Sequence, residues 1–436
     1  MKSLLLMTCL MVLFPFCGGA QETTPETSFF GPPSEAAVMK TETVEEETLF
    51  GKAGTIFHPF LAVNGYYRDN LFNTKEDEKD DYVTDIMPGI WIALPGSRQP
   101  LLSLNTLNTA PGGLEISRFK TAAERPFQGY ALYRANIRRH DEFSEEDTEN
   151  HRAEGLLRFR FRNDIEIEFA DIFEVEQDPY GTGTSTEMDE YTSNLFNTMV
   201  TLPITSKIAL RADYSHYFLD YDLDRNGYRD RSDNAVSCYL FFKIFQKTSI
   251  FIEYEFVDID YDKDILLDSQ EHHYFFGIRW KYSDKTFARF KIGYGLKDYD
   301  DDRVDDPDNL IGDFLLNFQS SEKTRLYLQA YRQVNETNTI IYRDMISNRA
   351  RLGYVQKLFG KCEAKAHVGY SRDYYRGGGP GEKRKDDYID AEVALGYSPF
   401  KWLAVSAGYN FGSRNSNDDR YDYDTNTYFA TITVAL

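Results

Sequence analysis

Basic residues are in short supply in this sequence. Its 436 residues include 49 Lys and Arg against 70 Asp and Glu, which leaves a formal net charge of −21. Proteins that bind nucleic acid neutralise its phosphates with clustered Lys and Arg. The acidic balance therefore argues against nucleic acid as a partner.

Long apolar runs are also missing beyond the first twenty residues. No stretch there approaches the roughly 20 apolar residues that a membrane-spanning helix needs. The mean hydropathy of −0.52 is typical of a soluble protein, but one class of membrane protein shares it. In a transmembrane β-barrel, polar residues that face the lumen dilute the apolar residues that face lipid.

Cysteines and catalytic motifs are scarce as well. Two of the four cysteines, Cys9 and Cys17, fall in the apolar N-terminal stretch, and Cys238 and Cys362 lie far apart. We therefore expect no disulfide framework. The sequence contains no G-x-S-x-G, P-loop or H-E-x-x-H motif, so we expect no catalytic residues and no enzymatic activity.

The N-terminus has the pattern of a secretory signal peptide. Lys2 precedes the apolar stretch LLLMTCLMVLFPFC, and small residues follow up to Ala20. This pattern predicts a signal peptide over residues 1–20, cleaved before Gln21. A lipoprotein signal with Cys17 as the lipidated residue is the alternative, and the bulky Phe16 before it argues against that. Residues 21–54 are rich in Thr, Glu and Pro and predict an acidic, flexible periplasmic segment.

From Thr55 onward, apolar and polar residues alternate with a period of two. In the stretch 249–256, for example, Ile250, Ile252 and Tyr254 alternate with Glu253 and Glu255. This period is typical of β-strands with one apolar and one polar face. No comparable helical period occurs in this region, so the sequence predicts an all-β fold.

The connections between these strands alternate in length. Short links such as 203–206 and 283–285 alternate with long acidic links such as 178–190 and 300–308. A transmembrane up-and-down antiparallel β-barrel has this arrangement, with short periplasmic turns and long extracellular loops. We therefore predict an outer-membrane barrel over residues 55–436.

The alternation predicts about 18 strands, within a range of 16 to 20. They are expected at 55–67, 81–94, 127–139, 151–163, 164–177, 190–202, 206–220, 233–245, 248–260, 270–282, 285–299, 309–320, 323–333, 343–356, 361–372, 387–398, 401–412 and 423–436. Three alternatives are open for residues 95–126: two more short strands, a folded-in plug, or a periplasmic loop. The apolar alternating C-terminus would close the barrel against its first strand, since an open sheet edge is not tolerated in lipid.

A family resemblance is found near the start of the predicted barrel. The segments PFLAVNGYYRDNLFNT and DDYVTDIMPGIWIALPGSRQP resemble the opening of an outer-membrane β-barrel porin family. In that family a Tyr-Asx-Asn strand end precedes a strand with a Pro-Gly pair, and the matching residues here are Tyr67, Asp69, Asn70, Pro88 and Gly89. The resemblance implies a large bacterial channel, and some members are linked to extracellular polysaccharide systems. Residues 100–126 look like an insertion relative to the family.

If the apolar residues face lipid, the alternating charged residues face the lumen. The predicted pore-lining residues are Arg134, Arg138, Arg158, Arg160, Arg162, Glu166, Glu168, Arg211, Asp213, Glu253, Glu255, Arg289, Lys291, Glu363 and Lys365. Arg160 and Arg162 are expected to approach Glu166 and Glu168 across a turn. Charges in a pore set ion and solute preference, and about 16 to 18 strands enclose an aqueous channel. We expect a channel, either for small hydrophilic solutes or for export of a polysaccharide. The alternative is a non-conducting surface scaffold or adhesin with binding loops.

One loop also has the spacing of a calcium-binding loop. The stretch that begins DLDRNGYRD supplies oxygen atoms at the required positions, from Asp222, Asp224, Asn226, Tyr228, Asp230 and Asp233. The alternative is a solvated hairpin loop rich in Asp and Asn. No other cofactor is expected. The expected partners are outer-membrane lipids, lipopolysaccharide, the barrel assembly machinery and, for an exporter, a polysaccharide.

Overall fold

The computed structural model describes residues 56–94, 101–105, 115–119, 126–178, 180, 189–263, 265–283, 286–301, 307–377 and 384–435. For residues 101–105 and 115–119 it describes the course of the backbone. The predicted signal peptide and acidic segment lie outside the described residues.

Eighteen strands form one antiparallel sheet that closes on itself. They are β1 (Phe57–Arg68), β2 (Asp81–Leu94), β5 (Phe127–His140), β6 (Thr148–Arg160), β7 (Glu166–Gln177), β8 (Glu190–Pro203), β9 (Ile208–Tyr221), β10 (Arg231–Phe245), β11 (Thr248–Tyr261), β12 (Ser269–Lys281), β13 (Phe287–Tyr299), β14 (Asp308–Ser321), β15 (Thr324–Glu336), β16 (Asp344–Lys357), β17 (Cys362–Arg376), β18 (Lys385–Phe400), β19 (Leu403–Ser416) and β20 (Tyr423–Ala435). Each strand pairs with its neighbours in the chain, and β20 pairs with β1 to complete the ring.

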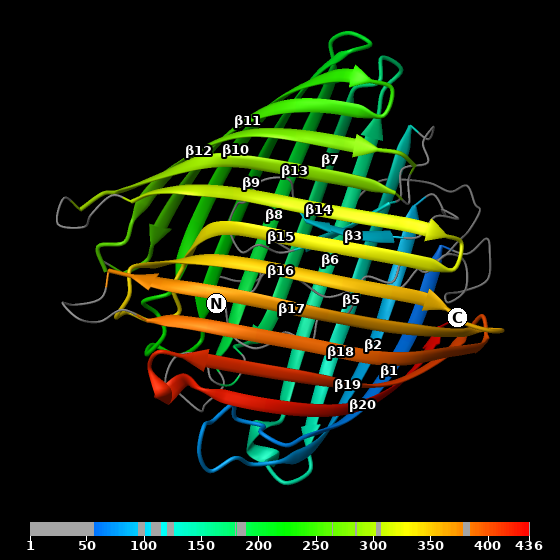
Figure 1. The fold of residues 1–436 in the computed structure, drawn as a ribbon, viewed down its shortest axis with the longest axis vertical. Helices are drawn as coiled ribbons and strands as arrows, with labels where there is room; N and C mark the ends of the chain where they lie inside the picture. The colour runs from blue at the N-terminus through cyan, green and yellow to red at the C-terminus, as the bar shows by residue number, and fades with distance from the viewer. Residues whose placement is uncertain are drawn as a thin grey trace.

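The predicted all-β barrel of 18 strands is therefore confirmed. Most strand ends agree with the prediction within a few residues. The largest differences are at the ends of β17 and β19, which extend four residues beyond the expected 372 and 412. β6, expected at 151–163, spans Thr148–Arg160, three residues earlier at both ends. In Figure 1 the arrowheads of β17 and β19 point toward one end of the barrel, and those of β14 and β16 toward the other. The longer links between strands lie at the first of these ends, as expected for an extracellular face.

Between β2 and β5 the structure describes two short strands that stay apart from the ring. These strands, β3 (Leu101–Asn105) and β4 (Glu115–Phe119), pair only with each other within the described part of the chain. Because β2 pairs directly with β5, the alternative of a barrel with 20 strands is wrong. β4 runs near β6 and β7, and Figure 1 shows β3 between the near and far walls of the barrel.

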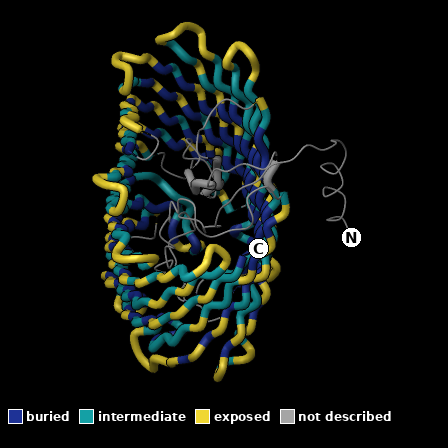
Figure 2. The backbone as a smooth tube through the Cα atoms, turned by 90° about the vertical axis from the view of Figure 1, so that its right-hand side faces the viewer, coloured by how far each residue is buried: buried dark blue, intermediate teal, exposed yellow. Residues whose placement is uncertain are grey.

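Helical structure in the described residues is limited to two short 3₁₀ turns, η2 (Ser144–Glu146) and η3 (Asp419–Tyr421). Among those residues, no helix is long and apolar enough to cross a bilayer. Figure 2 shows exposed and less exposed residues alternating along the strands, with exposed residues gathered at the links between them. The period of two in the sequence thus separates two faces of one wall.

Candidate functional site

The two faces of the barrel wall carry charged and apolar residues in the reverse of the arrangement found in a soluble protein, where apolar residues are buried and charged residues are exposed. On β11, Glu253 and Glu255 are almost fully buried, whereas Ile252 is 53% exposed. On β13, Lys291 is 2% exposed and its neighbour Ile292 is 43% exposed. Charged side chains therefore lie inside the ring and apolar side chains cover its outside. This distribution suits a barrel with hydrocarbon outside and a polar lumen.

The structure places fourteen of the fifteen predicted lining residues on the inner face of strands. They are Arg134, Arg138, Arg158, Arg160, Glu166, Glu168, Arg211, Asp213, Glu253, Glu255, Arg289, Lys291, Glu363 and Lys365. Arg162 differs, because β6 ends at Arg160 and Arg162 lies exposed in the turn that follows. The alternation alone could not show where that strand stops.

Most of these inner charges pair with one another. Arg158 reaches Glu166 at 2.9 Å and Arg160 reaches it at 3.6 Å, so two arginines share one carboxylate next to the β6–β7 turn. The expected contact between Arg160 and Glu166 is present. The second arginine that reaches Glu166 is Arg158, whereas the prediction had named Arg162. A buried charge needs such a partner, because desolvation is costly.

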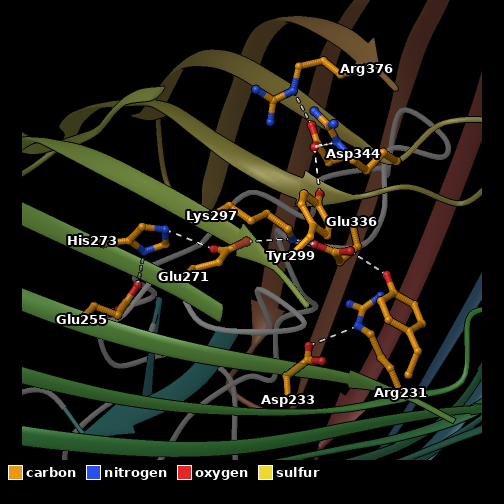
Figure 3. A network of polar contacts seen from close by, with 12 residues as sticks. Arg231, Asp233, Glu255, Glu271, His273, Lys297, Tyr299, Glu336, Asp344 and Arg376 are labelled. Atoms are coloured by element: carbon orange, nitrogen blue, oxygen red, sulfur yellow. Dashed lines mark hydrogen bonds and ion pairs between the residues drawn. The ribbon is translucent and has the colours of Figure 1, made fainter. Parts of the chain in front are cut away.

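A second group of paired charges crosses the inner wall from β11 to β15, as part of the larger network in Figure 3. His273 lies 2.9 Å from Glu255 through Nδ1 and 3.1 Å from Glu271 through Nε2. Lys297 Nζ lies 2.9 Å from Glu271 and also contacts Glu336. The imidazolium form of His273 would satisfy both carboxylates with its two N–H donors.

The prediction included Glu255 but missed His273, Glu271, Lys297 and Glu336. The first three follow the same alternation on β12 and β13, so the pattern could have found them. Glu336 is the last residue of β15, and its contact with Lys297 bypasses β14. No local pattern in the sequence indicates that contact.

Two inner cations near the periplasmic end have no acidic partner within the part of the chain described. Arg279 on β12 lies directly opposite Arg289 on β13, and its guanidinium carbon is 5.1 Å from the centre of the Phe241 ring. Lys243 on β10 is exposed and pairs in register with Ser249. Arg289, in contrast, is 2.8 Å from Asp313. Unpaired cations in a lumen attract anions.

Several residues of the predicted calcium loop have other partners in the structure. Asp233 belongs to β10, where it faces inward and lies 3.1 Å from Arg231. Asp230 accepts a hydrogen bond from the backbone N–H of Tyr221 at 2.9 Å, and burial raises the pKa of its carboxyl. Lys263 Nζ donates to the carbonyl of Asp224 at 3.2 Å.

Across the described residues, no three His, Cys, Asp or Glu side chains form a group that could hold a metal ion. Calcium binding at residues 222–233 stays a prediction without support from this geometry.

The residues of the family motif lie where the barrel closes. Asn70 is fully buried and donates from Nδ2 to the carbonyl of Asp424 at 3.1 Å. Gly89 lies directly opposite Phe60, whose ring covers it. These residues connect β1 to both of its neighbours in the ring, β20 and β2.

Comparison with known proteins identifies a family. The model of the family described as "Putative beta-barrel porin 2" matches residues 128–436, well over half of the chain. The match spans β5 to β20 and leaves out residues 57–100, where the motif residues occur. No curated protein sequence matches the chain.

Several solved structures from Pseudomonas aeruginosa are similar in their overall course. OccK2 (OpdF) has 10% sequence identity, with 87% of this chain and 98% of that chain covered and a TM-score of 0.45. The outer membrane protein opdK has 10% identity, with 87% and 99% covered and a TM-score of 0.44.

Proposed function

We propose that this barrel, which belongs to the porin family "Putative beta-barrel porin 2", is an open channel for passive diffusion of small hydrophilic solutes. The chain is a porin-like β-barrel of the outer membrane. One observation carries the proposal: charged side chains fill the inner face of a closed ring of 18 strands while apolar side chains cover the outer face. A ring of this size leaves room for water.

The test is a conductance measurement on the purified mature chain in planar lipid bilayers. Stable, ohmic current steps are expected, and mock-purified detergent extract is the control. A folded barrel that inserts but carries no current would contradict the proposal and favour the surface scaffold.

Uptake into proteoliposomes then defines the solutes. We expect small sugars, amino acids and organic ions to enter, with rates that fall steeply as size increases. Passage of long polysaccharide chains at a rate similar to that of small sugars would instead favour an exporter.

A further inference from the structure

A row of polar side chains crosses the outer face of β15 to β18. Arg332 on β15 is in register with Asn348 on β16, Asn348 with Arg372 on β17, and Arg372 with Asp387 on β18. All four belong to the set of alternating positions that faces away from the lumen. We call these four residues the outer polar row.

The outer polar row is surrounded by apolar side chains. On the periplasmic side of the row, Leu352 and Val368 are 43% and 49% exposed, and Ile389 is 45% exposed. On the other side lie Ile346 and the exposed Tyr374. Arginine on a lipid-facing surface is unfavourable unless it meets an anion or water, with a cost that depends on depth. The row therefore needs a polar environment at this height in the membrane.

The protein supplies only part of the charge that the row requires. Arg372 pairs with Asp387, and Lys385 Nζ also reaches Asp387 at 3.2 Å. Arg332 donates from Nε to the carbonyl of Leu310 at 2.9 Å and from a terminal nitrogen to Asn348 Oδ1. Both of these acceptors are neutral, and no described carboxylate pairs with Arg332. Arg372 and Lys385 thus share one carboxylate, Asp387, and Arg332 adds a third positive charge to the row.

The hydrogen bond to Leu310 has a local explanation. Pairing between β14 and β15 stops at Gly312 and Arg332, so the carbonyl of Leu310 lies beyond the end of the paired strands. It accepts its hydrogen bond from the side chain of Arg332 instead of from a backbone N–H. This explains the hydrogen bond that Arg332 Nε donates. It leaves the positive charge of Arg332 facing the membrane.

The height of the row indicates which anion is available. Arg332 lies four residues before the end of β15, and Arg372 four residues before the end of β17. Both ends carry long links and therefore belong to the extracellular side. The head groups at that height are those of the external leaflet of the outer membrane, where lipid A carries phosphate groups.

We propose that the outer polar row binds a phosphate group of lipid A. The guanidinium groups of Arg332 and Arg372 would hold the phosphate oxygens in charge-assisted hydrogen bonds. Asn348, in register between them, would hold the two arginines in position. Leu352 and Val368 below the row would pack against the acyl chains.

The test is a titration of the purified barrel with bis-phosphorylated lipid A in non-ionic detergent. Native mass spectrometry, which releases the barrel from the detergent, then measures the bound lipid A. The wild-type barrel should carry one lipid A adduct more tightly than the Arg332→Gln/Arg372→Gln variant by about tenfold or more. Lipid A without phosphate groups should bind the wild-type barrel no better than it binds the variant.

Arg139→Gln is the matched control. Arg139 also faces outward near the extracellular end of its strand, but it has its own carboxylate, Glu149, at 2.6 Å. This variant should bind lipid A as the wild type does. Heat-shifted gel mobility and circular dichroism establish that each variant is folded, and the single variant Arg332→Gln serves if the double variant does not fold.

Three results would overturn the proposal. They are equal binding of lipid A to the double variant, equal binding of phosphorylated and dephosphorylated lipid A to the wild type, and a change in oligomeric state without a change in lipid adducts. The last result would mean that a second copy of the chain covers the row. None of these depends on whether the barrel conducts.

Discussion

Asp69 accepts two hydrogen bonds from Asn426, one from the backbone N–H at 2.7 Å and one from Nδ2 at 2.6 Å. The two residues are 357 positions apart in sequence. Asp69 follows directly after β1 and Asn426 lies in β20, so these bonds join the two ends of the sheet. The aspartate of the porin-like motif thus has a specific structural role in closing the ring.

Replacing Asp69 with alanine should weaken the closure. The variant loses both bonds to Asn426, and we expect a loss of about 1 to 3 kcal/mol in the free energy of unfolding. Urea titration of the folded band on semi-native gels measures it. Asp77→Asn is the control, because Asp77 is an exposed loop residue with a left-handed backbone that asparagine tolerates, and its pair with Lys79 is also exposed. Equal midpoints for the two variants would show that Asp69 does not stabilise the closure.

Gly277→Ala should destabilise the barrel because an aromatic ring occupies the space above this glycine. Phe251 lies directly opposite on β11, and a Cβ on Gly277 would lie 2.2 Å from its ring. Overpacking of this kind costs about 1 to 3 kcal/mol. Gly65→Ala should have a much smaller effect, since nothing lies within 4 Å of its added Cβ. Thermal unfolding followed by gel mobility compares the two, and similar losses would count against the ring contact.

Lys291→Met should be one of the more damaging substitutions in the lumen. Lys291 Nζ lies 2.7 Å from Glu253, and both side chains are almost fully buried. Removing one partner of a buried pair costs about 3 to 5 kcal/mol, whereas replacing both is often nearly neutral. We therefore expect the double variant Lys291→Met/Glu253→Gln to recover much of the stability. A double variant less stable than Lys291→Met would contradict this.

Arg279→Gln should shift the ion selectivity of the channel toward cations. Arg279 faces the lumen beside Arg289 and has no acidic partner among the described residues. The reversal potential in a tenfold salt gradient measures the shift. Lys207→Gln, in the exposed turn between β8 and β9, should leave the potential unchanged. If both variants behave like the wild type, Arg279 does not contribute to selectivity.

Replacing residues 101–119 with a short Gly-Ser linker should raise the conductance. This deletion removes the β3–β4 pair, which lies near β6 and β7 and between the walls in Figure 1. Single-channel recordings compare the deletion with the full barrel, at matched gel mobility. An unchanged conductance would place the β3–β4 pair outside the path of the ions.

The sequence by itself determined the class of fold and the two faces of its wall. A period of two needs no knowledge of distant residues, because successive side chains of any strand point to opposite sides. This is why Glu253, Lys291 and Glu363 could be placed on the inner face. The alternating lengths of the links then distinguished the two ends of the barrel.

Only the tertiary structure decided which distant residues meet. The contacts of Lys297 with Glu336 and of Asn426 with Asp69 depend on the register between strands and on the closure of the ring. The same is true of β3 and β4, which pair with each other while β2 pairs directly with β5. Such pairings bring together residues that the local period of the chain cannot relate to one another.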